Sequence, residues 1–160
     1  MKDFKKGQQV IHCRDGLAVI VDETVMGDKN YFIVKTVRGD GENIYVPLDR
    51  ADAIIRFVMS EEEALKLIDY IKTIELDFNP NTKQRRDAIK KRLLSGDVKD
   101  AAYLFKQLYF FKTLKDGSIK YGPLDIDMLS FASDNLLDEF SISFKKHRDE
   151  IEEFVYNKLK

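Results

Sequence analysis

The amino-acid sequence predicts an α+β protein in which a β-rich first third is followed by an all-α remainder. Residues 8–58 contain short runs of β-branched and aromatic residues separated by turn-forming residues, which is typical of antiparallel strands. From residue 60 onward, apolar residues recur at the three- and four-residue spacing of amphipathic helices. Because the strands precede the helices, the alternating order of a parallel βαβ sheet is excluded. We therefore expect two domains, residues 1–58 and 59–160.

The first domain is expected to be a small antiparallel barrel or curled sheet. Its strand-like runs are residues 10–11, 17–21, 31–34 and 43–46. The turn-forming segments between them are residues 14–16, 26–30 and 38–41. Pro47 ends the last run, because proline has no N–H to donate to a sheet. Basic and acidic residues are equal in number over residues 1–58, which suits contact with protein better than contact with nucleic acid.

The first two helices of the second domain follow from capping signals and apolar spacing. Ser60 is a good N-cap, and Glu63 lies at the distance of a capping box. The apolar stripe of this helix comprises Ala64, Leu65, Leu67, Ile68 and Ile71. A loop at residues 77–81 comes next, after which we predict that Thr82 caps a second helix. Ile89 and Leu93 would form the inner face of that helix.

Three further helices complete the prediction. Gly96 is expected to end the second helix, and Asp97 to cap the third. Pro123 begins the fourth helix, with Asp125 in its first turn. A last helical segment covers residues 144–159. The predicted inner residues of these helices are Ala101, Leu104, Phe105, Leu108, Phe111, Met128, Leu129, Ala132, Leu136, Leu137, Phe140, Ile151, Phe154 and Val155.

The most unusual feature of the chain is the concentration of positive charge in the second helix. The protein has 27 basic and 28 acidic residues, so it is nearly neutral overall. The basic residues of the second helix are Lys83, Arg85, Arg86, Lys90, Lys91 and Arg92, and Asp87 is its one acid. Lys83, Arg86 and Lys90 share one face by helical spacing, whereas Arg85 and Arg92 lie on a different side. This cluster favours a phosphate-binding surface, and a simple solvated face is the alternative.

The sequence carries no convincing catalytic or metal-binding pattern. His12 and Cys13 are adjacent in a predicted strand, so their side chains point to opposite faces, and His147 is distant in sequence. The acid pairs 125/127 and 152/153 are interpreted as solvated residues or partners of helix dipoles. We expect a non-enzymatic protein without metal or cofactor. The alternative is a small hydrolase or metal enzyme that uses one of the two histidines or the cysteine.

The sequence also shows no recognisable targeting signal. The chain has one cysteine, its first residues lack the apolar core of a signal peptide, and no run is long enough to span a membrane. We expect a cytoplasmic protein with no membrane association.

The order of several segments is similar to the CarD/CdnL family of bacterial transcription regulators, over about residues 4–142. The segments in the first domain, which resemble a module also found in transcription-repair coupling factor, are Phe4–Ile11, Asp15–Ile20, Tyr31–Val34 and Ile44–Pro47. Those that resemble the family's helical domain are Arg85-Arg86, Leu94–Asp97, Leu108, Met128-Leu129, Ala132, Leu136 and Glu139.

The resemblance implies a Tudor-like barrel that binds the β subunit of RNA polymerase and a helical domain that rests on promoter DNA. Such proteins modulate open-complex formation and perform no covalent chemistry. The polymerase-binding residues implied by position are Ile44, Tyr45, Val46 and Pro47. The DNA-binding residues implied by position are Thr82, Lys83, Arg85, Arg86 and Lys90. We expect a monomer.

Two departures from the family pattern affect these expectations. Family members place a tryptophan wedge just before the arginine pair, where this chain has Thr82, and the chain contains no tryptophan. Threonine cannot supply the apolar surface of a wedge between bases. Some members carry an arginine in the polymerase-binding strand where this chain has Tyr45, which favours strand pairing with aromatic packing. An adaptor that binds polymerase or another protein without touching DNA is therefore the main alternative.

Overall fold

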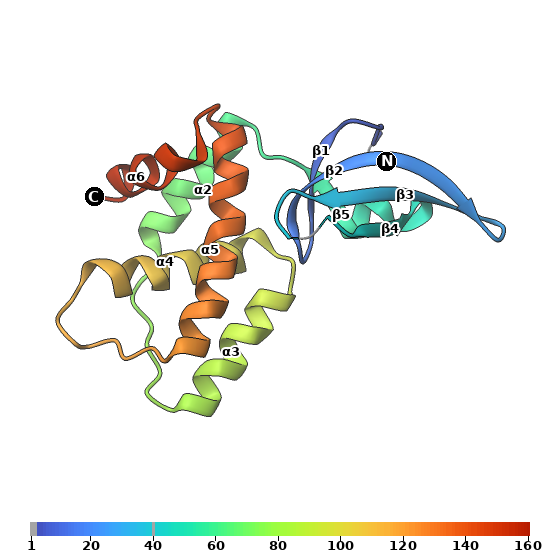
Figure 1. The fold of residues 1–160 in the computed structure, drawn as a ribbon. Helices are drawn as coiled ribbons and strands as arrows, with labels where there is room; N and C mark the ends of the chain where they lie inside the picture. The colour runs from blue at the N-terminus through green and yellow to red at the C-terminus, as the bar shows by residue number, and fades with distance from the viewer. Residues whose placement is uncertain (1–2, 40) are drawn as a thin grey trace. The chain divides into compact units, whose positions relative to one another are not determined.

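A computed structural model of the chain describes residues 3–39 and 41–160 (Figure 1). The chain divides into two compact units, Met1–Val58 and Met59–Lys160. An antiparallel sheet in the first unit is followed by helices in the second, which confirms the predicted α+β class. The turn predicted at residues 38–41 includes Asp40, which lies outside the described residues. The functional roles assigned to the two parts remain predictions.

The sheet of the first unit is strongly curved but open (Figure 1). Its strands are β1 (Gln9–His12), β2 (Gly16–Met26), β3 (Lys29–Thr36), β4 (Asn43–Pro47) and β5 (Ile55–Phe57). Their order is β4-β3-β2-β1-β5, with antiparallel neighbours throughout. β2 pairs with β1 near its start and with β3 over most of its length, with a register shift between Ile20 and Asp22. Because β4 and β5 do not pair with each other, the predicted barrel is a curled sheet with two edges.

Alternating side chains of these strands build the core of the first unit. Val10, Ile20, Val34 and Val46 have no exposed surface. The other buried members are Phe4, Ala18, Phe32, Ala51 and Ile55. A short 3₁₀ turn (Leu48–Arg50), α1 (Ala51–Ile54) and β5 were not resolved by the sequence pattern, because each is only three or four residues long. The outward residues of the same strands remain available for contacts.

Five longer helices form the second unit, and most of the predicted helix ends are confirmed. They are α2 (Glu61–Thr73), α3 (Thr82–Leu94), α4 (Val98–Thr113), α5 (Pro123–Ser143) and α6 (Arg148–Leu159). Ser60 and Glu63 form the predicted capping box, and Asp97 caps α4. The predicted cap of α3 is wrong by one residue. Asn81 accepts a hydrogen bond from the Gln84 N–H at 2.9 Å, so Thr82 is the first helical residue instead.

Helix α5 contributes to both apolar clusters of the second unit. One cluster joins α5 to α2, α4 and α6, and its members are Ala64, Leu67, Ile68, Ile71, Ala102, Phe105, Leu136, Leu137, Phe140, Ile151 and Val155. The other cluster joins α5 to α3 and α4, and its members are Ile89, Leu104, Leu108, Leu129 and Ala132. The second cluster sets the position of the basic helix. Within residues 3–39 and 41–160, no helix combines the length and apolarity needed to cross a membrane.

Two buried polar side chains of α4 hold the last turn of α2 and the segment that follows it. Lys106 Nζ donates to the Ile71 carbonyl at 2.7 Å, and burial lowers the pKa of this lysine. Gln107 donates from Nε2 to the Glu75 carbonyl and accepts from the Asp77 N–H through Oε1, both at 2.9 Å. The Lys106 bond satisfies a carbonyl in the last turn of α2, and the Gln107 bonds satisfy backbone groups of a segment without regular structure. They fix the path along which the chain enters α3.

Candidate functional site

Three lysines of α3 are exposed to solvent. They are Lys83, Lys90 and Lys91, and they form no ion pair with any described residue. Thr82 is also exposed, at the first turn of the helix, where backbone N–H groups lack intrahelical partners. Of the five predicted DNA-binding residues, Arg85 is buried. Thr82, Lys83 and Lys90 are exposed, and Arg86 is partly exposed. The exposed lysines remain available for phosphates.

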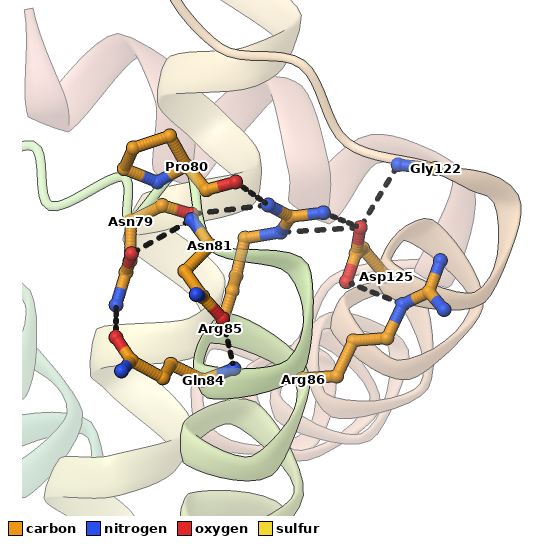
Figure 2. A network of polar contacts seen from close by, with 8 residues as sticks. All are labelled: Asn79, Pro80, Asn81, Gln84, Arg85, Arg86, Gly122 and Asp125. Atoms are coloured by element: carbon orange, nitrogen blue, oxygen red, sulfur yellow. Dashed lines mark hydrogen bonds and ion pairs between the residues drawn. The ribbon is translucent and has the colours of Figure 1, made fainter.

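Arg85 is turned inward, contrary to the expectation that it faces DNA. Its side chain is 8% exposed, and the guanidinium donates to Asp125 Oδ2 from Nη2 at 2.9 Å and from Nε at 3.3 Å (Figure 2). A third bond runs from Nη1 to the Asn79 carbonyl at 3.0 Å, and the guanidinium lies 5.1 Å from the centre of the Phe78 ring. These contacts tie α3 to α5 and to the preceding loop. Arg85 is a structural residue of the fold.

Asp125 is likewise buried, with no exposed surface, so it is not a solvated acid. Its place in the first turn of α5 fits the other interpretation, a partner of the helix dipole. Its Oδ2 also accepts from the Gly122 N–H at 2.9 Å (Figure 2). Burial by itself would raise the pKa of Asp125. The hydrogen bonds from Arg85 and Gly122 and the charges of both arginines outweigh burial and hold this pKa below its ordinary value. The carboxylate is therefore ionised at neutral pH.

Arg86 contacts the same carboxylate much more loosely than Arg85 does. Its Nε lies 3.5 Å from Asp125 Oδ1, and neither of these two buried atoms has a hydrogen-bond partner (Figure 2). The side chain is 37% exposed. Arg85 makes the hydrogen bonds to Asp125, whereas Arg86 contributes only a charge contact. Arg86 is therefore the arginine of this pair that remains available to an external anion.

Arg92 has internal partners at the other end of the helix. Its Nη1 donates to Asp100 at 2.8 Å, and its guanidinium lies over the Tyr103 ring at 3.7 Å from the centroid. Half of the basic residues of α3 thus contact acids within the same unit. The helix presents less free positive charge than its sequence suggests.

His12 supports a turn of the first unit. His12 is buried, and its Nδ1 accepts the N–H groups of Arg14 and Asp15, both at 3.3 Å. Burial lowers the pKa of His12, which favours the neutral acceptor that this turn requires. Cys13 is exposed, and His147 is an exposed residue at the start of α6 in the second unit. Among the described residues, no cluster of histidine, cysteine and acidic side chains has the arrangement of a metal site.

Strand β4 lies at one edge of the sheet, where it pairs only with β3. One side of its backbone therefore faces away from the sheet and can pair with another strand. Val46 is fully buried and Ile44 is partly buried against the core, whereas Tyr45 is 46% exposed on the opposite face. Pro47 shares that outer face by alternation. Strand β4 is therefore an edge strand with one buried and one exposed face.

Two residues of β3 extend the outer face beside β4. Ile33 pairs with Tyr45, and Tyr31 pairs with Pro47. These four residues, which we call the outer patch, are apolar or aromatic side chains that are half-buried or exposed.

The sequence of the first unit matches a known protein family. Residues 4–59 match the family of the CarD-like/TRCF RID domain. The match ends at the boundary of the first unit.

The RID domain family is known for interaction with RNA polymerase, and it is a protein-interaction domain rather than a catalytic one. This supports a polymerase-interacting role for the chain. All four predicted polymerase-binding residues lie in β4 of the RID domain, but only Tyr45 and Pro47 point outward. Tyr31 and Ile33 were not predicted as part of this surface. Their alternation with Phe32 and Val34 in one strand was the signal that would have placed them on its outer side.

Proposed function

We propose that this protein is a transcription regulator that binds the β subunit of RNA polymerase and contacts promoter DNA without sequence specificity, to modulate open-complex formation. The observation that carries the proposal is the open β4 edge, with the outer patch beside it, in a matched RID domain. The polymerase would bind at this edge. Helix α3 would lie on DNA phosphates.

Strand addition is the contact mode that fits β4. An extended segment of the β subunit would pair with those backbone groups of β4 that point away from β3, which gives affinity. The outer patch would pack against side chains of that segment, which gives specificity. Tyr45 is central because it combines an exposed ring with a position in the middle of the edge strand. Aromatic residues of this kind often dominate binding energy at interfaces.

The experiment that tests the polymerase contact is a binding assay with purified RNA polymerase and with its isolated β subunit. We expect Tyr45→Glu to weaken binding by about tenfold or more, because it places a charge in the centre of the patch. Val46 is unsuitable for this test, since a charge at a fully buried position would unfold the sheet. Val25→Glu is the matched control, because Val25 is 64% exposed near the tip of the β2–β3 hairpin.

Unchanged binding of Tyr45→Glu, with the wild type binding normally, would exclude the β4 contact. Absence of binding by the wild-type protein would exclude the polymerase partner itself. Circular dichroism of each variant establishes that the fold is retained.

The DNA contact would rest on the exposed lysines, on Arg86 and on the Thr82 hydroxyl. Cations that contact phosphates release counterions, so affinity should fall steeply with salt, with a logarithmic slope of about −0.9 for each phosphate contact. Changing Lys83 and Lys90 together to glutamate should weaken binding and reduce this slope by about 2. The matched control is the same change at Lys66 and Lys72 on α2, which removes equal charge elsewhere. A slope that the α3 variant leaves unchanged would exclude the contact.

A polymerase-binding adaptor without DNA contact is the second candidate. It is favoured by the internal partners of Arg85, Arg86 and Arg92, which reduce the free charge of α3. In vitro transcription with the Lys83/Lys90 variant separates the two functions. An adaptor would retain its full effect on transcription, whereas a regulator that contacts DNA would lose it.

A further inference from the structure

Arg86 occupies the middle of a row of three cations on α3. Lys83 and Lys90 lie three residues before and four residues after it, so the three residues share one side of the helix. Both lysines are exposed, and neither forms an ion pair with a described residue. The side chain of Arg86 is only 37% exposed and reaches Asp125 in the first turn of α5 (Figure 2). The middle cation of the row is therefore engaged within the protein.

The contact between Arg86 and Asp125 is an ion pair without a hydrogen bond. The two closest atoms, Arg86 Nε and Asp125 Oδ1, are 3.5 Å apart and buried, and neither has a hydrogen-bond partner among the described residues. A buried donor and a buried acceptor that stay unpaired cost free energy. The other carboxylate oxygen, Oδ2, is held by Arg85 and by the Gly122 N–H. Opening the ion pair therefore breaks none of the hydrogen bonds that hold Asp125.

Gly122 leaves the space in which the guanidinium of Arg86 lies. A Cβ at this position would be 3.2 Å from Arg86 Nη2, which is closer than a Cβ usually approaches another atom (Figure 2). The backbone of Gly122 has a φ of −80° and a ψ of 173°, an extended conformation that any residue adopts before a proline. Glycine is therefore not required by the backbone here. Its missing side chain provides room for Arg86 beside Asp125.

We propose that Asp125 competes with the phosphates of DNA for Arg86, so that the free protein holds one of its own DNA-binding cations in an autoinhibitory contact. A phosphate beside Lys83 and Lys90 would offer the guanidinium charge-assisted hydrogen bonds, which Asp125 Oδ1 does not form. Arg86 would then leave the carboxylate and join the two lysines. The inference rests on the DNA contact proposed above and adds an internal competitor that lowers its affinity.

The test displaces Arg86 from Asp125 without changing any charge. Gly122→Val places a branched side chain where the guanidinium lies and keeps the backbone N–H that binds Asp125. We expect its affinity for a short DNA duplex to exceed that of the wild type by about threefold, the equivalent of one partly exposed ion pair. The salt slope should stay the same, because Arg86 contacts phosphate in both bound states.

The matched control is the same substitution in an Arg86→Gln background. Arg86→Gln alone should weaken binding and reduce the salt slope by about 0.9, the value of one phosphate contact. Adding Gly122→Val should then change nothing, since no guanidinium remains to be released. A second readout needs no DNA. The Nε–H proton of Arg86 should exchange with water faster in Gly122→Val than in the wild type, as measured by nuclear magnetic resonance.

The outcomes separate this inference from the proposed function. Unchanged affinity in Gly122→Val, or an equal gain in the Arg86→Gln background, would overturn the inference and leave the phosphate contact of α3 in place. Absence of DNA binding by the wild type would overturn both. A thermal melt verifies that each variant folds. Gly122→Ala adds the Cβ alone, so it should give a smaller gain of the same sign even where valine disturbs the turn.

Discussion

Arg85 and Arg86 are neighbours in the sequence, yet Asp125 binds them in different ways. Arg85 makes two short bonds to one carboxylate oxygen, whereas Arg86 contacts the other oxygen without a hydrogen bond. A buried carboxylate needs one well-placed cation to offset its desolvation, and here Arg85 fills that role. The second arginine is then free for a different use. Helical spacing placed the two arginines on different sides of α3, but it did not show which of them meets a buried acid.

Replacing Asp125 with asparagine tests the structural role of the pair. The change keeps the shape but leaves the buried guanidinium of Arg85 without a counter-charge. We expect the free energy of unfolding at pH 7 to fall by about 3–5 kcal/mol, measured by urea denaturation. Asp127→Asn is the control, because Asp127 is exposed on the same helix. A loss no larger than that of the control would mean that the pair does not stabilise the fold.

The lowered pKa of Asp125 also predicts how the stability difference between the wild type and Asp125→Asn changes with pH. The pKa of Asp125 is lowered on folding from its ordinary value of 3.8. Its contribution to stability is therefore complete above about pH 5 and is lost as the pH falls through 4 and toward the folded pKa. The difference in stability between wild type and Asp125→Asn should shrink over this range. A difference that grows on acidification would contradict the lowered pKa.

At the scale of the element, the sequence pattern predicts contacts between residues that are close in the chain. It does not predict contacts between residues that are far apart in the chain. The capping box of α2 and the cap of α4 involve residues three or fewer apart, so their partners are visible in the pattern. The bond between Arg85 and Asp125 spans 40 residues, and the bonds of Gln107 to the α2–α3 segment span about 30. Such pairings depend on how helices pack, and no periodicity records them. The basic helix was identified, but its free and paired residues were not.

The α2–α3 segment provides a prediction at this scale. Gln107→Leu would leave the Glu75 carbonyl and the Asp77 N–H without their partner. We expect a loss of about 2–3 kcal/mol in the free energy of unfolding and faster hydrogen exchange at the Asp77 amide. Amides of α6, which lie outside this contact, should exchange as in the wild type. Unchanged exchange at Asp77 would mean that the side chain does not hold the segment.

The C-terminal end of α5 gives a second prediction, in which a substitution increases the free energy of unfolding. Lys145 has a φ of 54°, in the left-handed region, and the Lys146 N–H closes the helix on the Ser141 carbonyl at 2.9 Å. Glycine adopts this conformation without strain, so Lys145→Gly should raise the free energy of unfolding by about 0.5–1 kcal/mol. Lys146→Gly should instead destabilise, because it removes a cation 4.7 Å from the Phe154 ring. Thermal melts of both variants provide the comparison.

For the whole molecule, the proposed polymerase contact and the proposed DNA contact fall in different compact units. The β4 edge lies in the unit that matches the RID domain family, and α3 lies in the helical unit, beyond the matched residues 4–59. The sequence pattern predicted two units, because the spacing of apolar residues changes from strand-like alternation to helical spacing at one point in the chain. The polymerase partner was inferred from the resemblance to a family. The sequence did not show that the β4 edge of the sheet stays unpaired.

This separation predicts that the two functions can be removed independently. Tyr45→Glu should weaken polymerase binding by about tenfold or more and leave DNA affinity unchanged, while the Lys83/Lys90 variant should weaken DNA binding and leave polymerase affinity unchanged. Mixing the two variants in one transcription reaction should not restore activity, because a regulator of this kind must hold polymerase and DNA with the same chain. The measurement is open-complex lifetime on one promoter with wild type, each variant and the mixture. Restoration by the mixture would show that the two contacts act without a covalent link, and the regulator would then have to work through separate molecules.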